Sequence, residues 1–283
     1  MISILEEGRN YLKECNVLEP EASSEFLLSH VLGVGRAQIR SGLIGSVSRD
    51  EKNKFLSLIR RRSRHEPLSY VTGNQPFLDL TFLCGAGVLI PRPETEELVF
   101  KIFKNFEGRK KENLLFLDIG AGTGAISISL AHHFKQARVF AIEKSLRAMN
   151  WMKKNLGLYP KEARRISLRR QDMLKDWGLG RLKFDLIVSN PPYIPSSKIR
   201  KLEPEILREP RLALDGGPDG LKYLRRIFSC ALKYLRPSGT VMAEIGFGQG
   251  VKMREIMRKT GFGRAEVECD FAGIERFAIA QRD

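Results

Sequence analysis

Two stretches near the start of the chain place apolar side chains at helical spacing among polar ones. The first stripe is formed by Ile4, Leu5, Leu12 and Val17. The second is formed by Phe55, Leu56, Leu58 and Ile59. Because such spacing gathers apolar side chains on one helical face, we expect a small domain of short amphipathic helices over residues 1–69.

The pattern changes between residues 70 and 90. Residues that favour strands are interrupted there by turn formers, which are Gly73, Asn74, Pro76, Gly85 and Gly87. This texture predicts a β-hairpin that connects two domains over residues 70–90. Pro91 and Pro93 then open a predicted helix over residues 94–104, because proline suits the first helical turn and acidic residues suit its positive end.

From residue 112 onward, short apolar runs alternate with amphipathic segments. The runs predict strands at 114–119, 138–142, 166–170, 184–189, 239–245 and 275–280. The segments predict helices at 124–134, 145–157, 219–235 and 249–260. This alternation is typical of an α/β domain, here residues 91–283, with a mostly parallel sheet covered by helices on both faces. Because such sheets bind ligands beyond the carboxyl ends of their strands, we expect chemistry in the loops after the first four strands.

Length and charge add to this picture. The 283 residues suffice for two folding units, and the formal net charge is +15. Most of the basic excess follows residue 85, including Arg109-Lys110-Lys111 and the run 161–170. Such clusters suit either a solvated surface or an acidic partner such as RNA or the ribosome.

Several classes of protein are excluded by the sequence. No apolar run approaches the ~20 residues that a membrane span needs, and Glu6, Glu7 and Arg9 stand where a signal peptide would be apolar. The 4 cysteines form no CxxC pair, and the 4 histidines have no HxxxH spacing. We therefore expect a cytoplasmic protein that uses no metal and contacts no membrane.

The first strand of the predicted sheet runs into a glycine-rich loop, Asp118-Ile119-Gly120-Ala121-Gly122-Thr123-Gly124. The glycines let the backbone approach a ligand closely and expose amides at a helix start. With Ala125 the loop also fits a permissive dinucleotide-binding pattern, and a plain tight turn is a third interpretation. An acid just before the glycines favours a cationic ligand over a pyrophosphate.

Candidate ligand-binding side chains follow the next two strands. Glu143 ends the second strand, where its carboxylate can accept hydrogen bonds from both hydroxyls of a ribose. After the third strand, Asp172 can accept a bond from an adenine amino group while Met173 flanks the ring. An incidental surface position is the alternative for Glu143 and for Asp172.

The fourth strand runs into Asn190-Pro191-Pro192-Tyr193. Prolines cannot donate hydrogen bonds and hold the preceding backbone extended, so the Pro191 carbonyl and the Asn190 side-chain oxygen become fixed acceptors. Two neighbouring acceptors match one planar NH2 group, and Tyr193 offers a flat face for stacking. The motif therefore favours chemistry on a planar nitrogen.

The glycine loop, the acid after strand two and Asn190–Tyr193 together resemble the class I methyltransferases, which use S-adenosylmethionine and have a Rossmann-like sheet. Further motifs are similar to those of the release factor glutamine methyltransferases and lie at 88–96, 208–214, 216–221 and 244–249. The resemblance runs from about Tyr70 to the C-terminus, and the helical N-terminal region agrees with it in size and place.

This resemblance implies methyl transfer from S-adenosylmethionine to the side-chain nitrogen of the glutamine in the Gly-Gly-Gln motif of class 1 peptide chain release factors, with the N-terminal domain helping to hold that protein. It implies cofactor contacts from Gly120, Ala121, Gly122, Thr123, Gly124, Glu143, Met173 and Asn190, to which we add Asp172 from its position. It implies that the glutamine is held by Asn190, Pro191, Pro192 and Tyr193, of which Asn190, Pro191 and Tyr193 are the candidate catalytic residues. Met173 stands where the family often has an aromatic residue, and Glu143 where it usually has Asp.

Other functions stay open on the sequence alone. Adenine N6 of nucleic acid presents a similar NH2 group, and a ribosomal-protein glutamine would differ only in the substrate. A non-catalytic factor that binds release factors or RNA is the alternative from another class. Residues 91–96 are expected to form a lid or a helix start, and Glu244 is expected to be structural. Glu209-Pro210 and residues 216–220 are expected to form a substrate clamp or a structural loop.

Overall fold

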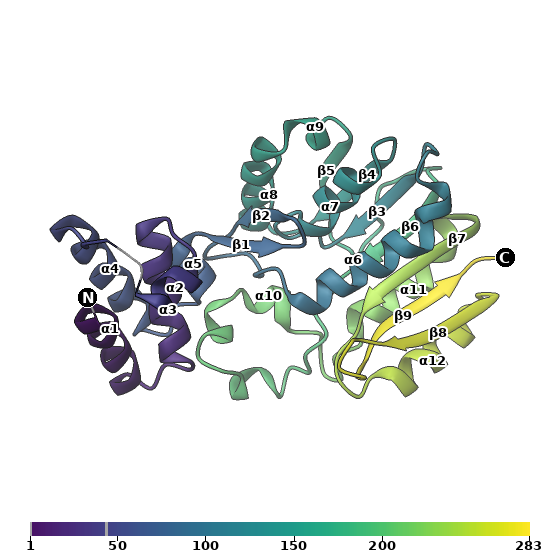
Figure 1. Cartoon of the computed structure of the whole chain (residues 1–283). Coiled ribbons are helices and arrows are strands. Elements are labelled where there is room, and N and C mark those ends of the chain that lie inside the picture. The colour runs from purple at the N-terminus through teal and green to yellow at the C-terminus, as the bar shows by residue number, and fades with distance from the viewer. Residues whose placement is uncertain (1, 43–44) are drawn as a thin grey trace. The chain divides into compact units, whose positions relative to one another are not determined.

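The computed structural model describes residues 2–42 and 45–283, which divide into two compact units (Figure 1). The first unit comprises the chain up to Asn74 and a short later segment, Glu203–Arg208. The second unit comprises Gln75–Leu202 and Glu209–Asp283. The chain therefore leaves the second unit after Leu202, shortly after the Asn-Pro-Pro-Tyr motif, and returns to it at Glu209.

The first unit is helical, as predicted. Its helices are α1 (Ile2–Glu14), α2 (Pro20–Leu32), α3 (Arg36–Ser41), α4 (Arg49–Arg62) and α5 (Leu68–Thr72). Ser48 and Glu51 form a capping box that satisfies backbone amides at the start of α4. The core contains Leu12, Leu27, Leu28, Phe55 and Ile59, so both predicted apolar stripes contribute to one interior.

The later segment is held in this unit by a buried arginine. Arg62 is 3% exposed, donates to Ser23 Oγ at 3.2 Å and pairs with Glu205 at 2.6 Å. Arg208 donates to the carbonyl of Arg64 at 2.7 Å. Because a buried cation is costly unless it is paired, Glu205 is an integral part of this unit.

The second unit contains the predicted hairpin and the predicted α/β sheet. The hairpin consists of β1 (Asn74–Phe77) and β2 (Leu80–Leu83), and α6 (Pro93–Phe106) follows it. The sheet consists of β3 (Leu115–Ile119), β4 (Arg138–Glu143), β5 (Ile166–Arg170), β6 (Phe184–Ser189), β7 (Leu235–Glu244), β8 (Arg264–Cys269) and β9 (Glu275–Gln281).

The strand order is β5-β4-β3-β6-β7-β9-β8. Strands β3 to β7 pair in parallel, while β9 runs antiparallel to both β7 and β8. This confirms the mostly parallel sheet, but β8 was missed. Residues 264–269 alternate charged and small apolar side chains, and this partly exposed edge strand lacks the apolar run that revealed the others.

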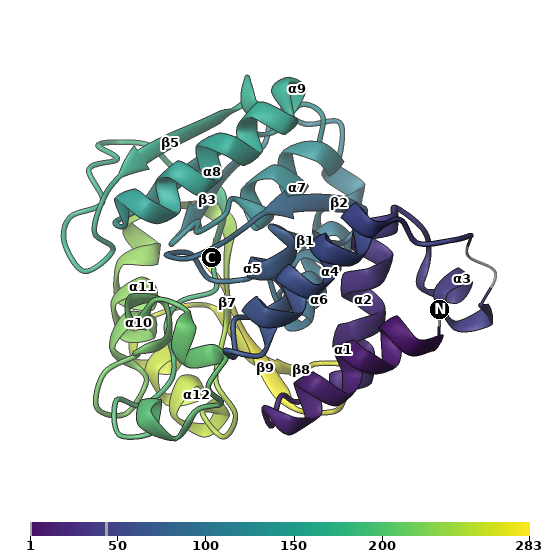
Figure 2. The same cartoon turned by 90° about the vertical axis from the view of Figure 1, so that its left-hand side faces the viewer.

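Helices cover both faces of the sheet (Figure 2). Helices α6, α7 (Ala125–His133) and α8 (Leu146–Leu158) lie on one face, with α9 (Pro160–Ala163) beside them, whereas α11 (Lys222–Tyr234) and α12 (Gly250–Lys259) lie on the other. Phe116 and Leu117, neighbours on β3, pack into the two separate cores because successive side chains of a strand point to opposite faces. The connection before α11 contains α10 (Arg211–Leu214).

The register of the sheet brings the predicted motifs to one level. Asp118 lies opposite Val188, and Ile119 lies opposite Ile142. One or two residues further along, Gly120, Glu143 and Asn190 therefore emerge at the same edge. Strand order reverses between β3 and β6, which is where sheets of this kind bind ligands. In the part of the chain that the structure describes, no helix is both long and apolar enough to cross a membrane.

Candidate active site

A cavity lies at the carboxyl ends of β3, β4, β5 and β6. Of the residues that the sequence singled out, it is lined by Gly120, Ala121, Gly122, Thr123, Glu143, Asp172, Met173, Asn190 and Pro192. Gly124, Pro191 and Tyr193 are outside this lining. Segments that precede the sheet in the sequence complete the walls, among them Val88, Ile90, Pro91 and Thr95. The structure thus brings the motifs at four strand ends and the start of α6 to one site.

The glycine loop turns by adopting a backbone conformation that other residues rarely take. Gly120, Gly122 and Gly124 have φ values of 77°, 58° and 85°. A Cβ at Gly120 would lie only 2.9 Å from Met173 Cε, so the loop and the methionine are closely packed. Helix α7 begins directly afterwards, at Ala125. The loop therefore presents bare backbone to the cavity at the start of a helix.

Glu143 is fixed at the edge of this loop. Its Oε2 accepts a hydrogen bond from the Gly122 amide at 3.0 Å, and its Oε1 accepts one from the Ser145 amide at 2.7 Å. Burial raises the pKa of Glu143 above its ordinary value, while these backbone donors act in the opposite direction. Glu143 is 9% exposed, and the two backbone amides set the orientation of its carboxylate.

Asp118 lies beneath the loop. It is fully buried, accepts a hydrogen bond from Ser127 Oγ at 2.6 Å, and does not line the cavity. Burial raises the pKa of Asp118 to about 7. Its side chain attaches α7 to β3 and is not part of the cavity wall.

Asp172 lines the cavity but already has partners. Its Oδ2 pairs with Lys144 Nζ at 2.8 Å, and its Oδ1 accepts from the Leu174 amide at 3.0 Å. Met173 packs beside it against the glycine loop. Each of the two acids thus has one donor on each oxygen, but the charge of Asp172 is neutralised by Lys144, whereas Glu143 has only backbone amides as partners.

Asn190 is held by a chain of buried polar groups. Its Nδ2 donates to Thr95 Oγ1 at 2.7 Å, and Thr95 Oγ1 donates to Glu244 Oε2 at 2.7 Å. The Tyr193 hydroxyl donates to Glu244 Oε1 at 2.9 Å. Sequence reasoning gave neither Thr95 nor Glu244 a role at the site, although both lie in the family-like motifs 88–96 and 244–249.

Two other motifs support the backbone of the Asn-Pro-Pro-Tyr loop. A Cβ at Gly220 would lie 2.2 Å from the Tyr193 carbonyl oxygen, so only glycine fits there. Gln249 Nε2 donates to the same oxygen at 2.9 Å, and Gln249 Oε1 accepts from the Gly246 amide at 2.8 Å. The loop after β6 is thus held by residues from two distant parts of the sequence.

Residues 91–96 both wall the cavity and start a helix. Pro93 begins α6, as predicted. Glu209 fastens the preceding residues, because its carboxylate accepts from the Ile90 amide at 2.9 Å and pairs with Arg92. Glu209, from the segment expected to form a clamp, therefore contacts residues 90 and 92. Arg92 and Pro210 both line the cavity.

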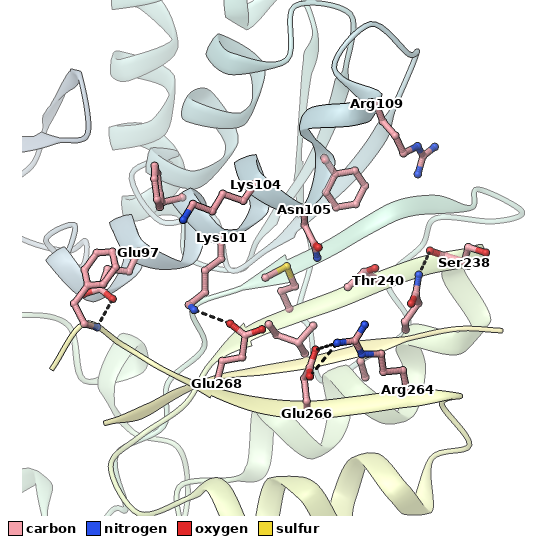
Figure 3. Close-up of a pocket in the computed structure, with 17 residues that line it drawn as sticks. Glu97, Lys101, Lys104, Asn105, Arg109, Ser238, Thr240, Arg264, Glu266 and Glu268 are labelled. Carbon is pink, nitrogen blue, oxygen red and sulfur yellow. Dashed lines mark hydrogen bonds and ion pairs between the residues drawn. The ribbon is translucent and has the colours of Figure 1, made fainter. Parts of the chain in front are cut away.

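A second cavity, of about 530 Å³, lies between α6 and strands β7, β8 and β9 (Figure 3). Its charged side chains are largely occupied with one another. Lys101 pairs with Glu268 at 2.6 Å, and Arg264 pairs with Glu266 at 3.0 Å. It contains none of the residues that the sequence predicted for cofactor binding, for holding the glutamine or for catalysis.

The sheet order and the cavity at the reversal point define the chain as a class I methyltransferase. Residues 3–73 match the family described as the PrmC N-terminal domain, and residues 98–218 match the methyltransferase small domain. The release factor glutamine methyltransferase of Geobacter sulfurreducens is 36% identical over 96% of this chain and 93% of its own length. That of Moorella thermoacetica is 37% identical over 94% and 93%. The chain belongs to the release factor glutamine methyltransferase family.

A solved structure agrees with the fold. The Thermus thermophilus 16S rRNA N2 G1207 methyltransferase, in complex with AdoMet and guanosine, has a TM-score of 0.51 and 19% identity, and the match covers 74% of this chain and 50% of that one. At this level of identity the likeness concerns the architecture alone.

Proposed function

We propose that the cavity binds S-adenosylmethionine through the glycine loop and the three side chains that follow β4 and β5. The fit rests on two observations. The loop offers glycine backbone with no Cβ between it and the cavity, and Glu143 is aimed at the same edge by the amides of Gly122 and Ser145. Gly120–Gly124 would hold the amino acid part of the cofactor, Glu143 the ribose, and Asp172 and Met173 the adenine.

The acceptor is the side-chain amide nitrogen of a glutamine, and the observation that carries this is the orientation of Asn190. Because its NH2 group is bonded to Thr95, its carbonyl oxygen Oδ1 is the end left for the cavity. An oxygen acceptor at that place would match one hydrogen of a primary amide, and the carbonyl of Pro191, which is next in the chain although outside the cavity lining, would accept the other. Family membership supports the Gly-Gly-Gln glutamine of class 1 release factors as the substrate.

These acceptors address the main difficulty of the reaction. An amide nitrogen is a weak nucleophile because its lone pair is delocalised into the carbonyl. The cofactor, when bound, supplies an electrophilic methyl group. Asn190 and Pro191 would orient the nitrogen and stabilise the positive charge that develops on it, while Tyr193 flanks the amide plane. The released proton passes to water, so no side chain is assigned as a general base.

The helical first unit would help to hold the release factor. Segment 203–208 supports this, because it begins ten residues after Tyr193 and is part of that unit through Glu205 and Arg208. The chain therefore links the proposed glutamine site directly to the proposed protein-binding unit.

The test is methyl transfer from labelled S-adenosylmethionine to three acceptors in parallel: an unmodified class 1 release factor, a ribosomal-protein pool and an RNA pool. Peptide mass spectrometry then locates the label. We expect it on the Gly-Gly-Gln glutamine, and Asn105→Ala, a change of an exposed asparagine on α6, serves as a control that retains activity. Label on RNA or on a ribosomal protein would overturn the substrate while keeping the cofactor. Absence of transfer and of cofactor binding by calorimetry would favour a non-catalytic binding protein.

A further inference from the structure

Asn190, Thr95 and Glu244 are joined by a chain of hydrogen bonds. The carboxylate of Glu244, at the end of this chain, determines which group donates in each bond. Glu244 is 1% exposed and Thr95 is 5% exposed, so both residues are buried. Ionised Glu244 can only accept hydrogen bonds, so the Thr95 hydroxyl hydrogen must point to it. Thr95 then has only lone pairs to offer Asn190.

This direction fixes which end of the Asn190 amide faces the cavity. An asparagine amide has nearly the same shape in its two flipped orientations, but only one places NH2 against a lone pair of Thr95. The opposite orientation would set the Asn190 oxygen against the Thr95 oxygen and turn NH2 towards the substrate. A substrate amide would then meet a donor in place of an acceptor.

Packing alone does not explain a carboxylate at this place. Burial raises the pKa of Glu244 to about 7, which reflects the cost of keeping a charge in the interior. A neutral side chain of the same size would fill the space without that cost. Glu244 instead joins Asn190, through Thr95, to Tyr193 at the other end of the same motif.

We propose that Glu244 and Thr95 are positioning residues that hold Asn190 with its side-chain oxygen towards the substrate amide. This inference rests on the proposed function and adds to it the groups that make Asn190 an acceptor. Neither residue needs to touch the substrate, because both act through the asparagine.

The rate of methyl transfer should therefore depend on whether Glu244 is ionised. A protonated carboxyl can donate to Thr95 Oγ1, which frees the Thr95 hydrogen to point at Asn190 and favours the wrong amide orientation. The charged and titratable groups around Glu244 are Glu94 on α6, Tyr193 after β6 and Arg276 on β9. Glu94 raises the pKa of Glu244 and Arg276 lowers it. Since the ionised form is the active one, kcat should rise as the pH increases through about 7.

The kinetic test compares Thr95→Val with Thr95→Ser and Glu244→Gln, with cofactor and release factor saturating. We expect Thr95→Val to lower kcat about 10- to 100-fold and to leave the KM for S-adenosylmethionine within about threefold, because only the acceptor is misoriented. Thr95→Ser keeps the hydroxyl and should restore kcat to within about threefold of wild type. Glu244→Gln should lose the rise in kcat near pH 7. Asp118 titrates in the same range but lies under the glycine loop, so its effect should fall on the cofactor KM.

A second readout needs no turnover and separates this inference from the proposed function. In ¹⁵N-labelled protein, the side-chain NH2 signal of Asn190, assigned with Asn190→Asp, should shift with pH with a midpoint near 7 in wild type. It should not shift in Thr95→Val or Glu244→Gln. Wild-type kcat for Thr95→Val, no advantage of serine over valine, or an unchanged Asn190 titration in Glu244→Gln would overturn the inference. A wild-type enzyme that shows the titration but labels no glutamine would overturn the function alone.

Discussion

The loops after β3 and β6 lie at the same edge of one sheet, yet they are built in different ways. The loop at Gly120–Gly124 is mainly backbone, shaped by its own glycines and by Glu143 one strand away. The loop at Asn190–Tyr193 depends on side chains from far along the chain, namely Thr95, Gly220, Glu244 and Gln249. A cofactor that is the same in every turnover can be held by a local motif. Orienting the amide of Asn190 requires contacts from several distant segments of the chain.

The largest effect is expected from removing the acceptor itself. Asn190→Ala should lower turnover about 100- to 1,000-fold, the size seen when one pre-organised polar contact to a developing charge is lost. Affinity for S-adenosylmethionine should change about fivefold at most, because the cofactor is held mainly by the other loop. Methyl-transfer rates and calorimetry measure the two quantities. Undiminished turnover would remove Asn190 from the catalytic role, and Asn105→Ala controls for the chemical change.

The next effect is expected from disturbing the framework of the second loop. Gly220→Ala places a Cβ against the Tyr193 carbonyl, in a residue with φ of 77°. Gly273→Ala is the matched control, since its φ is 78° but nothing lies within 4 Å of the new Cβ. The control should cost about 1–2 kcal/mol of unfolding free energy, and Gly220→Ala should cost about 1–3 kcal/mol more from overpacking. Thermal unfolding of both variants measures this, and equal losses would show that the close contact carries no cost.

A smaller effect, confined to the cofactor, is expected at the first loop. Glu143→Gln turns one oxygen into an NH2 group that would face a backbone amide donor. The Kd for S-adenosylmethionine should rise about 10- to 100-fold, as for loss of a hydrogen bond to a charged group, while turnover at saturating cofactor changes much less. Calorimetry beside Glu255→Gln, an exposed control on α12, checks this. A fall in turnover at saturating cofactor with an unaltered Kd would contradict the proposal that the first loop binds the cofactor and the second loop orients the substrate.

The smallest effect is expected at Asp172. Lys144 already neutralises the charge of Asp172, so Asp172→Asn should change the Kd for S-adenosylmethionine by no more than about threefold. Comparison with the Kd of Glu143→Gln shows which of the two acids contributes more to cofactor binding. A tenfold or greater loss would show that Asp172 binds the adenine more strongly than its present partners suggest.

The same contrast explains what the sequence could predict. The glycine loop, Glu143 and the Asn-Pro-Pro-Tyr motif each follow a buried strand directly, so periodicity and local residue chemistry were enough to place them at one edge. Thr95 and Glu244 are separated by 149 positions in the chain, and no local pattern indicates that a helix start and a strand end will share a hydrogen bond. Strand β8 was missed for a related reason, because it is defined by its pairing with β9 rather than by its own composition.

The ion pair between Arg62 and Glu205 has a consequence for how this architecture can be inherited or recombined. The chain passes between the two units at three points, after Asn74, after Leu202 and after Arg208. Suppose that only the first 74 residues were exchanged with those of a distant relative. The residue at position 62 would then come from one protein, and its partner at position 205 would come from the other. Wherever the acid at position 205 is missing, the new helical unit would contain a buried guanidinium without its carboxylate partner. The two units are therefore expected to be exchanged successfully only together with this six-residue segment.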